Sequence, residues 1–259
     1  MGNATARMLA LNGYFVFALD KKPFISSEKN IMPILADVTN IQSLQNAFEE
    51  ISKTTAELFA IIHFAGYYML DSLIESEEKA FTNAFDVNFF GAFRVNKIFF
   101  PLLKRGSRII ITTSELAPLA PLPFTGIYAL TKSALDKYAY SLRMEVQLKG
   151  ISVSVLRPGA VKTDMLGAST SALDRFTQST KLYHYNASRF KRIVDSVEAR
   201  NVPADKIARK TLGILKAKHP KHVYKINRNP LLLLLNVLPK RLQTFIIKQI
   251  LKERKDKNG

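Results

Sequence analysis

The stretch that decides the fold is residues 109–165, IIITTSELAPLAPLPFTGIYALTKSALDKYAYSLRMEVQLKGISVSVLRPGAVKTDM. A β-branched strand over residues 108–113 leads into Ser114 and a proline-rich loop. A helical run follows over about residues 128–149, and a second buried strand, residues 151–156, stops before an Arg-Pro-Gly turn. Strands that alternate with helices in this way predict an α/β fold.

Tyr128 and Lys132 are four residues apart, so on a helix they lie on one face, one turn apart. An ammonium group there lowers the pKa of a phenol because it stabilises the phenolate. Tyr128 is therefore a candidate proton donor and acceptor. The pair alone is common by chance, but Ser114 strengthens the prediction, because a hydroxyl at the carboxyl end of a strand faces the crevice where α/β folds bind ligands.

Three features together resemble the core of the short-chain dehydrogenase/reductase family: Ser114, the Tyr128-x-x-x-Lys132 pair and Pro158-Gly159-x-Val161-x-Thr163. The resemblance covers residues 2 to about 228. It implies a Rossmann-like, doubly wound parallel sheet in a three-layer αβα domain. It also implies an oxidoreductase that transfers a hydride between NAD(P)(H) and an alcohol/carbonyl pair.

The resemblance implies catalytic roles for Asn88, Ser114, Tyr128 and Lys132. Tyr128 would exchange the proton with the substrate oxygen, and Ser114 would hydrogen-bond that oxygen. Lys132 would lower the pKa of Tyr128 and hold the nicotinamide ribose, and Asn88 would hold a water of a proton relay. A buried Asn inside the helix expected over residues 78–105 is costly unless it is hydrogen-bonded, which marks Asn88 even without the family.

The implied cofactor-binding residues are Gly2, Asp20, Asp37, Val38, Ala65, Gly66, Tyr128, Lys132, Pro158, Gly159, Val161 and Thr163. Asp20 ends an expected strand, where an acidic side chain binds the adenosine ribose hydroxyls and repels a 2′-phosphate, so it favours NAD. Lys21 and Lys22 follow at once and leave NADP open. Asp37 would contact the adenine, and the nicotinamide carboxamide would meet Thr163 and the backbone near Val161.

The glycine-rich turn of a dinucleotide site is incomplete. Such a site opens with a strand and a Gly-rich turn at a helix N-terminus, but the eleven glycines include no Gly-x-Gly, and Gly2 resembles only the last glycine of that turn. The absent first strand would lie at the centre of the sheet, between the strands at residues 14–19 and 58–63, which would lose backbone partners there. We therefore expect the functional protein to begin before Met1; a cofactor-deficient relative is the alternative.

Length and composition limit the possible fold, the possible metal or disulfide sites and the expected location. The length of 259 residues and 47% apolar content suit an α/β domain, and without cysteine there is neither a disulfide nor a thiolate metal site. His63 has no second ligand at metal-binding spacing, so no metal is expected. We see no signal peptide and no apolar run of membrane-spanning length, so a cytoplasmic protein is expected.

The net charge of +17 is concentrated near the C-terminus. Residues 1–180 carry 18 Lys/Arg and 16 Asp/Glu, whereas residues 181–259 carry 20 and 5. A positive field of this size suggests an anionic partner surface. The sequence contains no nucleic-acid-binding motif, and we expect no nucleic acid to bind. The sequence decides nothing about a homo-oligomer.

We expect one domain over residues 1–228, with a mobile lid at about residues 165–200, and a basic amphipathic appendage at 229–259. Residues 230–239 contain LLLLLNVL, and residues 240–252 place Lys/Arg opposite an apolar stripe. This tail fits a peripheral membrane contact through residues 229–252. It fits equally a helix that closes the substrate pocket or packs on a partner subunit.

The aromatic lid and apolar tail suggest a lipophilic alcohol or ketone as substrate. The alternative function is a cofactor-deficient binding protein of the same fold at a membrane surface.

Overall fold

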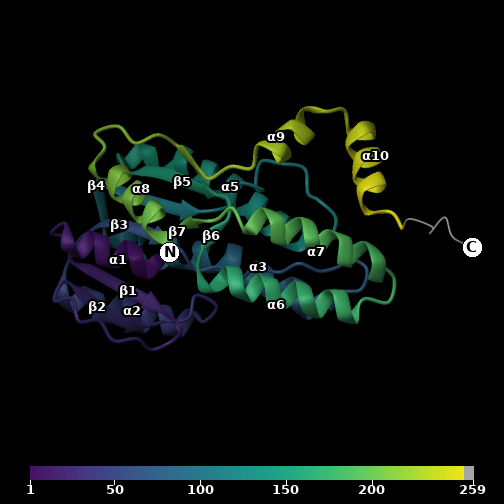
Figure 1. Cartoon of the computed structure of the whole chain (residues 1–259). Helices are drawn as coiled ribbons and strands as arrows, with labels where there is room; N and C mark the ends of the chain where they lie inside the picture. Colours follow the sequence, from purple (N-terminus) through teal and green to yellow (C-terminus); the bar gives the residue numbers. More distant parts are fainter. Residues whose placement is uncertain (254–259) are drawn as a thin grey trace, which may run out of the picture.

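The computed structural model describes residues 1–253, and strands and helices alternate along the chain (Figure 1). The strands are β1 (Val16–Asp20), β2 (Ile31–Leu35), β3 (Leu58–His63), β4 (Leu103–Thr112), β5 (Ser152–Pro158), β6 (Val161–Lys162), β7 (Val202–Pro203) and β8 (Val223–Ile226). The helices are α1 (Gly2–Leu11), α2 (Ile41–Thr54), α3 (Glu78–Phe85), α4 (Gly91–Phe99), α5 (Gly126–Val146), α6 (Asp164–Ser179), α7 (His184–Glu198), α8 (Ala204–Lys216), α9 (Pro230–Val237) and α10 (Lys240–Leu251).

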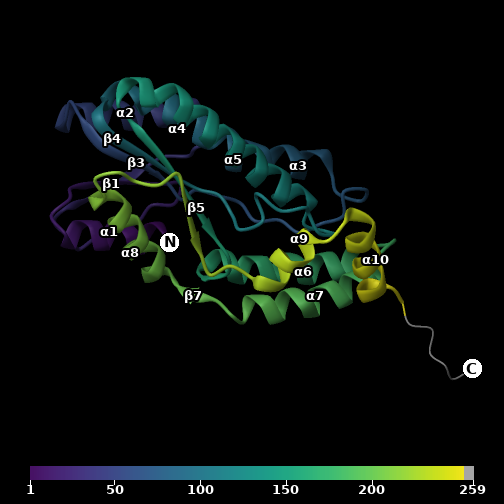
Figure 2. The ribbon, with the colours of Figure 1, turned by 90° about the horizontal axis from the view of Figure 1, so that it is seen from above.

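The predicted three-layer α/β architecture is confirmed. Every strand pairing in the described chain is parallel, in the orders β1–β2, β3–β4–β5–β8 and β6–β7. Figure 2 shows α2, α4 and α5 on one face of the central strands and α1 and α8 on the other. The middle of β4, Ile109–Ile111, is fully buried, as expected for a parallel strand covered on both faces.

The sheet is interrupted where the sequence predicts a missing strand. In the described chain, no backbone pairing joins β1 to β3. The two strands meet through side chains instead, since the rings of Tyr14 and Phe59 stack with centroids 6.1 Å apart and Val16 shares a hydrophobic cluster with Ala60 and Ile62. This apolar contact holds β1–β2 beside the four-stranded group.

The helix predicted over residues 78–105 is wrong at its C-terminal end. The chain forms α3, a π-helical turn at Asp86–Phe90, α4 and a short 3₁₀ turn at Phe100–Leu102, and β4 then begins at Leu103. Pro101 explains the stop, because its ring fixes the backbone and removes an N–H that a continuing helix would need.

The polar stretch at residues 167–200, which shows no clean boundary in the sequence, forms most of α6 and α7, which pack on each other. The tail forms α9 and α10, and α10 packs on α7, where Asn186 Nδ2 donates to the Leu251 carbonyl at 2.7 Å. Residues 254–259 of the predicted appendage lie outside the described residues. Among residues 1–253, none of the helices has the length and apolar character needed to cross a membrane.

Candidate active site

Ser114 and Tyr128 are brought together at the carboxyl edge of the sheet. Ser114 follows β4, and Tyr128 lies in the first turn of α5; both are buried, and their side chains are hydrogen-bonded to each other. The Tyr68 ring packs edge-on against Tyr128 with centroids 4.5 Å apart. The phenol oxygen is thus fixed beside a second hydroxyl at the end of the strand.

Burial controls the proton affinity of Tyr128. It raises the pKa of Tyr128 to about 12, while the hydrogen bond with Ser114 lowers the pKa and the nearby Glu115 carboxylate raises it. Lys132 is not among the causes of this shift, so the expectation that it lowers the pKa of Tyr128 stays a prediction. Burial destabilises the phenolate more than its neighbours stabilise it, so Tyr128 holds its proton at neutral pH.

Lys132 is a buried cation with spare hydrogen-bonding capacity. Its ammonium nitrogen lies 5.8 Å from the Tyr128 ring centre and donates to the Thr112 carbonyl at 3.3 Å. Burial lowers the pKa of Lys132 to about 8. In the described chain, no ion pair to a carboxylate compensates this charge. An ammonium with three N–H donors, of which the described contacts use one, fits a ligand that carries several hydroxyl groups, as a ribose does.

Asn88 lies in the π-helical turn and is fully hydrogen-bonded behind the site. Its Oδ1 accepts from the Tyr67 N–H at 2.6 Å, and its Nδ2 donates to the Tyr67 carbonyl at 2.8 Å and to the Thr131 hydroxyl at 3.0 Å. Among the described residues, no hydrogen bond links Asn88 to Lys132. Thr131, which the sequence did not single out, donates to the Tyr128 carbonyl at 2.8 Å and so connects Asn88 to the first turn of α5.

A cavity of about 570 Å³ opens above the Ser114–Tyr128 pair. It collects most of the residues that the sequence predicts for the nicotinamide end of the site, namely Gly66, Ser114, Tyr128, Lys132, Pro158, Gly159, Val161 and Thr163. Its polar groups gather at the floor, whereas the walls from α7, α9 and α10 are largely Leu, Ile, Val and Phe. The cavity therefore combines one polar, proton-carrying corner with a large apolar volume.

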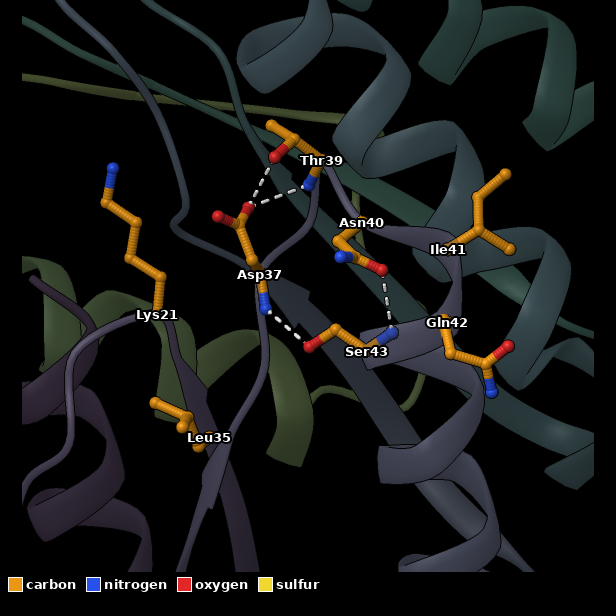
Figure 3. A pocket seen from close by; sticks show the side chains of 8 residues that line it. All are labelled: Lys21, Leu35, Asp37, Thr39, Asn40, Ile41, Gln42 and Ser43. Atoms are coloured by element: carbon orange, nitrogen blue, oxygen red, sulfur yellow. Dashed lines mark hydrogen bonds between the residues drawn. The ribbon is translucent and has the colours of Figure 1, made fainter.

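The predicted adenosine-binding residues lie apart from this cavity, at the carboxyl ends of β1 and β2. Figure 3 shows a second pocket there, of about 670 Å³, with Lys21 and Asp37 in its lining. Asp37 accepts both the N–H and the hydroxyl of Thr39 at 2.8 Å, and these bonds lower the pKa of Asp37. Asp20 is exposed and accepts the Lys22 N–H at 2.9 Å.

The remaining predicted cofactor residues have local packing roles. Val38 lies against α4 so closely that a Cβ on Gly91 would come within 2.7 Å of it. Gly2 begins α1 beside Phe64, and Ala65 is exposed. Gly159 lines the cavity, but glycine is required there because a Cβ would meet the Asn227 carbonyl oxygen at 2.1 Å.

Glu115 is a site residue that the sequence analysis missed. It lies next to Ser114, lines the cavity, and accepts the Asn229 N–H at 2.7 Å, so it ties the start of α9 to the end of β4. Burial raises the pKa of Glu115, and this raised pKa is partly offset by the Asn229 N–H and the charge of Arg228. The sequence carries one signal for it, an acidic residue directly after a strand-end serine.

Comparisons with known proteins agree with this geometry. A family profile described as short chain dehydrogenase matches residues 1–174. The 3-ketodihydrosphingosine reductase of Bacteroides thetaiotaomicron is 27% identical over 191 residues, which cover 70% of this chain and 71% of that protein. Estradiol 17-beta-dehydrogenase 2 of Mus musculus is 29% identical over 180 residues, which cover 64% of this chain and only 47% of that protein.

Solved structures share the fold. A short-chain dehydrogenase from Streptomyces avermitilis superposes with a TM-score of 0.74 at 15% identity and covers 96% of this chain, with 91% of that chain matched. A short chain dehydrogenase from Burkholderia cenocepacia in complex with NADP gives 0.71 at 17% identity, covering 97% of this chain and 93% of that one.

Proposed function

The chain belongs to the short-chain dehydrogenase family, and from this premise we propose that it is an oxidoreductase that transfers a hydride between NAD(P)(H) and an alcohol/carbonyl pair. The observation that carries the proposal is the hydrogen-bonded Ser114–Tyr128 pair, with buried Lys132 one turn further along α5, at the floor of one cavity. A phenol that keeps its proton at neutral pH is suited to donate it to a substrate oxygen.

In the direction of carbonyl reduction, the Tyr128 hydroxyl donates its proton to the substrate oxygen, and the Ser114 hydroxyl donates a hydrogen bond to the same oxygen. The Lys132 ammonium stabilises the phenolate that Tyr128 then becomes. When bound, a nicotinamide cofactor would supply the hydride. Lys132, Gly66 and the segment from Pro158 to Thr163 would hold its nicotinamide half, and Asp20 and Asp37 its adenosine half. Asn88 positions the Tyr67 backbone and, through Thr131, the start of α5.

We propose NAD as the preferred cofactor because Asp20 ends β1 with a carboxylate that repels a 2′-phosphate. Lys21 and Lys22 act in the opposite sense, and a family structure holds NADP. A comparison of KM for NADH and NADPH decides between them. Asp20→Asn should narrow any preference for NADH, and an unchanged ratio would remove Asp20 from this role.

The substrate is proposed to be a lipophilic ketone or its alcohol. The cavity walls are apolar, and two relatives are named for a long-chain ketone and a steroid. The assay is oxidation of NADH and NADPH with a long-chain ketone and with a small polar ketone. A clear preference for the polar ketone would contradict the substrate class.

Tyr128→Phe tests the chemistry. Removal of the only proton donor proposed for the substrate oxygen should lower turnover by about 100-fold or more, while the fold is retained. Tyr140→Phe on the same helix is the matched control, because Tyr140 is exposed. Equal turnover in the two variants would overturn the role of Tyr128.

The second candidate is a cofactor-deficient binding protein of the same fold, whose ligand would fill the apolar part of the cavity. It predicts that a lipophilic ligand binds in the cavity while NADH and NADPH do not bind. Fluorescence titration of the two nucleotides separates the candidates directly.

A further inference from the structure

The helices α9 and α10 form a wall of the cavity on one side and an outer surface on the other. We propose that this outer face binds the surface of an anionic lipid bilayer, so that the mouth of the cavity opens at the lipid. Membrane docking does not depend on the proposed enzymatic function; only the idea that substrate arrives from the lipid rests on it. Figures 1 and 2 both place α10 at the end of the molecule opposite α1, where a flat surface could reach it.

The inner face of the tail is fixed in place. The side of the tail that faces the cavity contributes Leu232, Leu235, Leu238, Ile246 and Ile247 to its lining. The buried Gln243 of α10 donates to the Leu238 carbonyl at 2.6 Å, and Asn236 accepts the Ala120 N–H at 2.7 Å. These bonds tie α10 to the end of α9, and α9 to the loop between β4 and α5. The tail is thus a fixed wall of the cavity, with one face toward the cavity and the other face turned outward.

The outer face is apolar and does not belong to the cavity lining. Val237 is 83% exposed and Phe245 is 57% exposed, and neither lines the cavity. Leu231 and Leu234 line the cavity and are still 65% and 64% exposed, so they mark its mouth. Leu234 and Val237 are three residues apart on α9, so the exposed apolar face of this helix reaches the mouth of the cavity.

Cations surround this apolar face. Arg241 and Lys248 lie four residues before and three residues after Phe245, which places them on the same side of α10. Residues 229–253 contain four Lys/Arg and one acidic residue. In the described chain, none of these four cations forms an ion pair. Aromatic and aliphatic groups flanked by unpaired Lys/Arg are the pattern of a helix that lies in a membrane interface.

The charge favours a bilayer over a second copy of the chain. A two-fold contact through this face would bring Arg241 and Lys248 of one copy against the same residues of the other. An anionic lipid surface instead neutralises them and accepts Phe245 and Val237 among its acyl chains. The partner that satisfies both the charge and the apolar surface is therefore an anionic bilayer.

The test is co-sedimentation of the full chain with phosphatidylcholine vesicles, made with and without phosphatidylserine. We expect binding to the anionic vesicles that weakens with salt. Arg241→Glu/Lys248→Glu should reduce the bound fraction by about tenfold, as expected when two cations that each attract the surface are reversed. Lys206→Glu/Lys210→Glu on α8 is the matched control, because it makes the same charge change in another exposed part of the basic segment.

Each other outcome overturns the proposal. Equal losses in the α10 and α8 variants would mean a general attraction of a basic protein to anionic vesicles. Equal binding to both vesicle types would exclude the charge-based surface. Self-association that Phe245→Ser abolishes, without any vesicle binding, would assign the face to a second copy. The readout needs neither cofactor nor turnover, so its failure is distinct from failure of the proposed enzymatic function.

Discussion

Tyr128 and Lys132 are both buried at the floor of the cavity, and burial moves their pKa values in opposite directions. The pKa of Tyr128 rises to about 12, and that of Lys132 falls to about 8. Each shift favours the neutral form of the side chain, because a buried charge loses its hydration. A polar ligand at the cavity floor would therefore give Tyr128 and Lys132 hydrogen bonds in place of the hydration that they lose on burial.

Lys132 should make the free energy of unfolding vary with pH in the alkaline range. Its pKa is about 8 in the folded state against 10.5 for an ordinary lysine, so between these values the unfolded chain binds a proton that the folded protein has released. The free energy of unfolding should then rise with pH in this window, by up to about 3 kcal/mol. Urea unfolding at several pH values measures the slope.

Lys132→Met should remove this dependence and should be the more stable protein at neutral pH. Lys137→Met on the same helix is the control, because Lys137 is exposed. If the free energy of unfolding varied with pH in the same way in the wild type and in Lys132→Met, Lys132 would not be the source of the pH dependence.

Asn88→Ala should destabilise the fold by about 3 kcal/mol, because it removes three hydrogen bonds of a buried side chain, two to the Tyr67 backbone and one to the buried Thr131 hydroxyl. Thermal unfolding checks the size of the loss. Asn83→Ala in α3 removes an exposed asparagine and should change the midpoint little. If both variants lose the same stability, the π-helical turn does not depend on Asn88.

Helices α6 and α7 are held over the site by contacts at their joining turn. Glu75, in the segment between β3 and α3, accepts the Thr180 hydroxyl at 2.6 Å and the N–H groups of Lys181 and Leu182 at 2.7 and 3.1 Å. Phe124, before α5, packs among Phe176, Tyr183 and Phe190. The lid proposed for about residues 165–200 is thus anchored at one end by a single carboxylate and an aromatic cluster.

Glu75→Ala should loosen the turn between α6 and α7. Without the carboxylate, three hydrogen-bond donors of that turn lose their acceptor, so amide exchange and protease cleavage near residues 180–183 should accelerate. Glu77→Ala is the nearby control, because Glu77 is exposed and makes no side-chain cap bond to α3. Exchange rates that stay unchanged in Glu75→Ala would show that the aromatic cluster alone anchors the turn.

The elements were largely predictable from local pattern, and the errors have local causes. The period of apolar residues located β3, α2 and α5, while Pro101 and the π-helical turn broke the helix expected over residues 78–105. The place of α9 and α10 was not predictable, because an amphipathic helix shows which face is apolar but not what covers that face. Only the tertiary structure shows that its partner is the cavity.

In the whole molecule, the site lies where the sheet, the α6–α7 pair and the tail meet. The residues grouped by the family motif converge there, since they all follow the carboxyl ends of adjacent parallel strands or begin α5. Glu115 and Thr131 escaped prediction because their roles depend on partners 114 and 43 residues away in the chain. The basic residues concentrate in the C-terminal third, which includes the outer face proposed to meet a bilayer.

The most direct test of hydride transfer at the Tyr128 site follows deuterium from NADH and NADPH that carry deuterium at both C4 positions of the nicotinamide. Each cofactor is incubated with the protein and a long-chain ketone, and the alcohol product is analysed by mass spectrometry. We expect one deuterium on the carbinol carbon with the wild type and almost no product with Tyr128→Phe. Alcohol without deuterium, or equal product from both proteins, would contradict it.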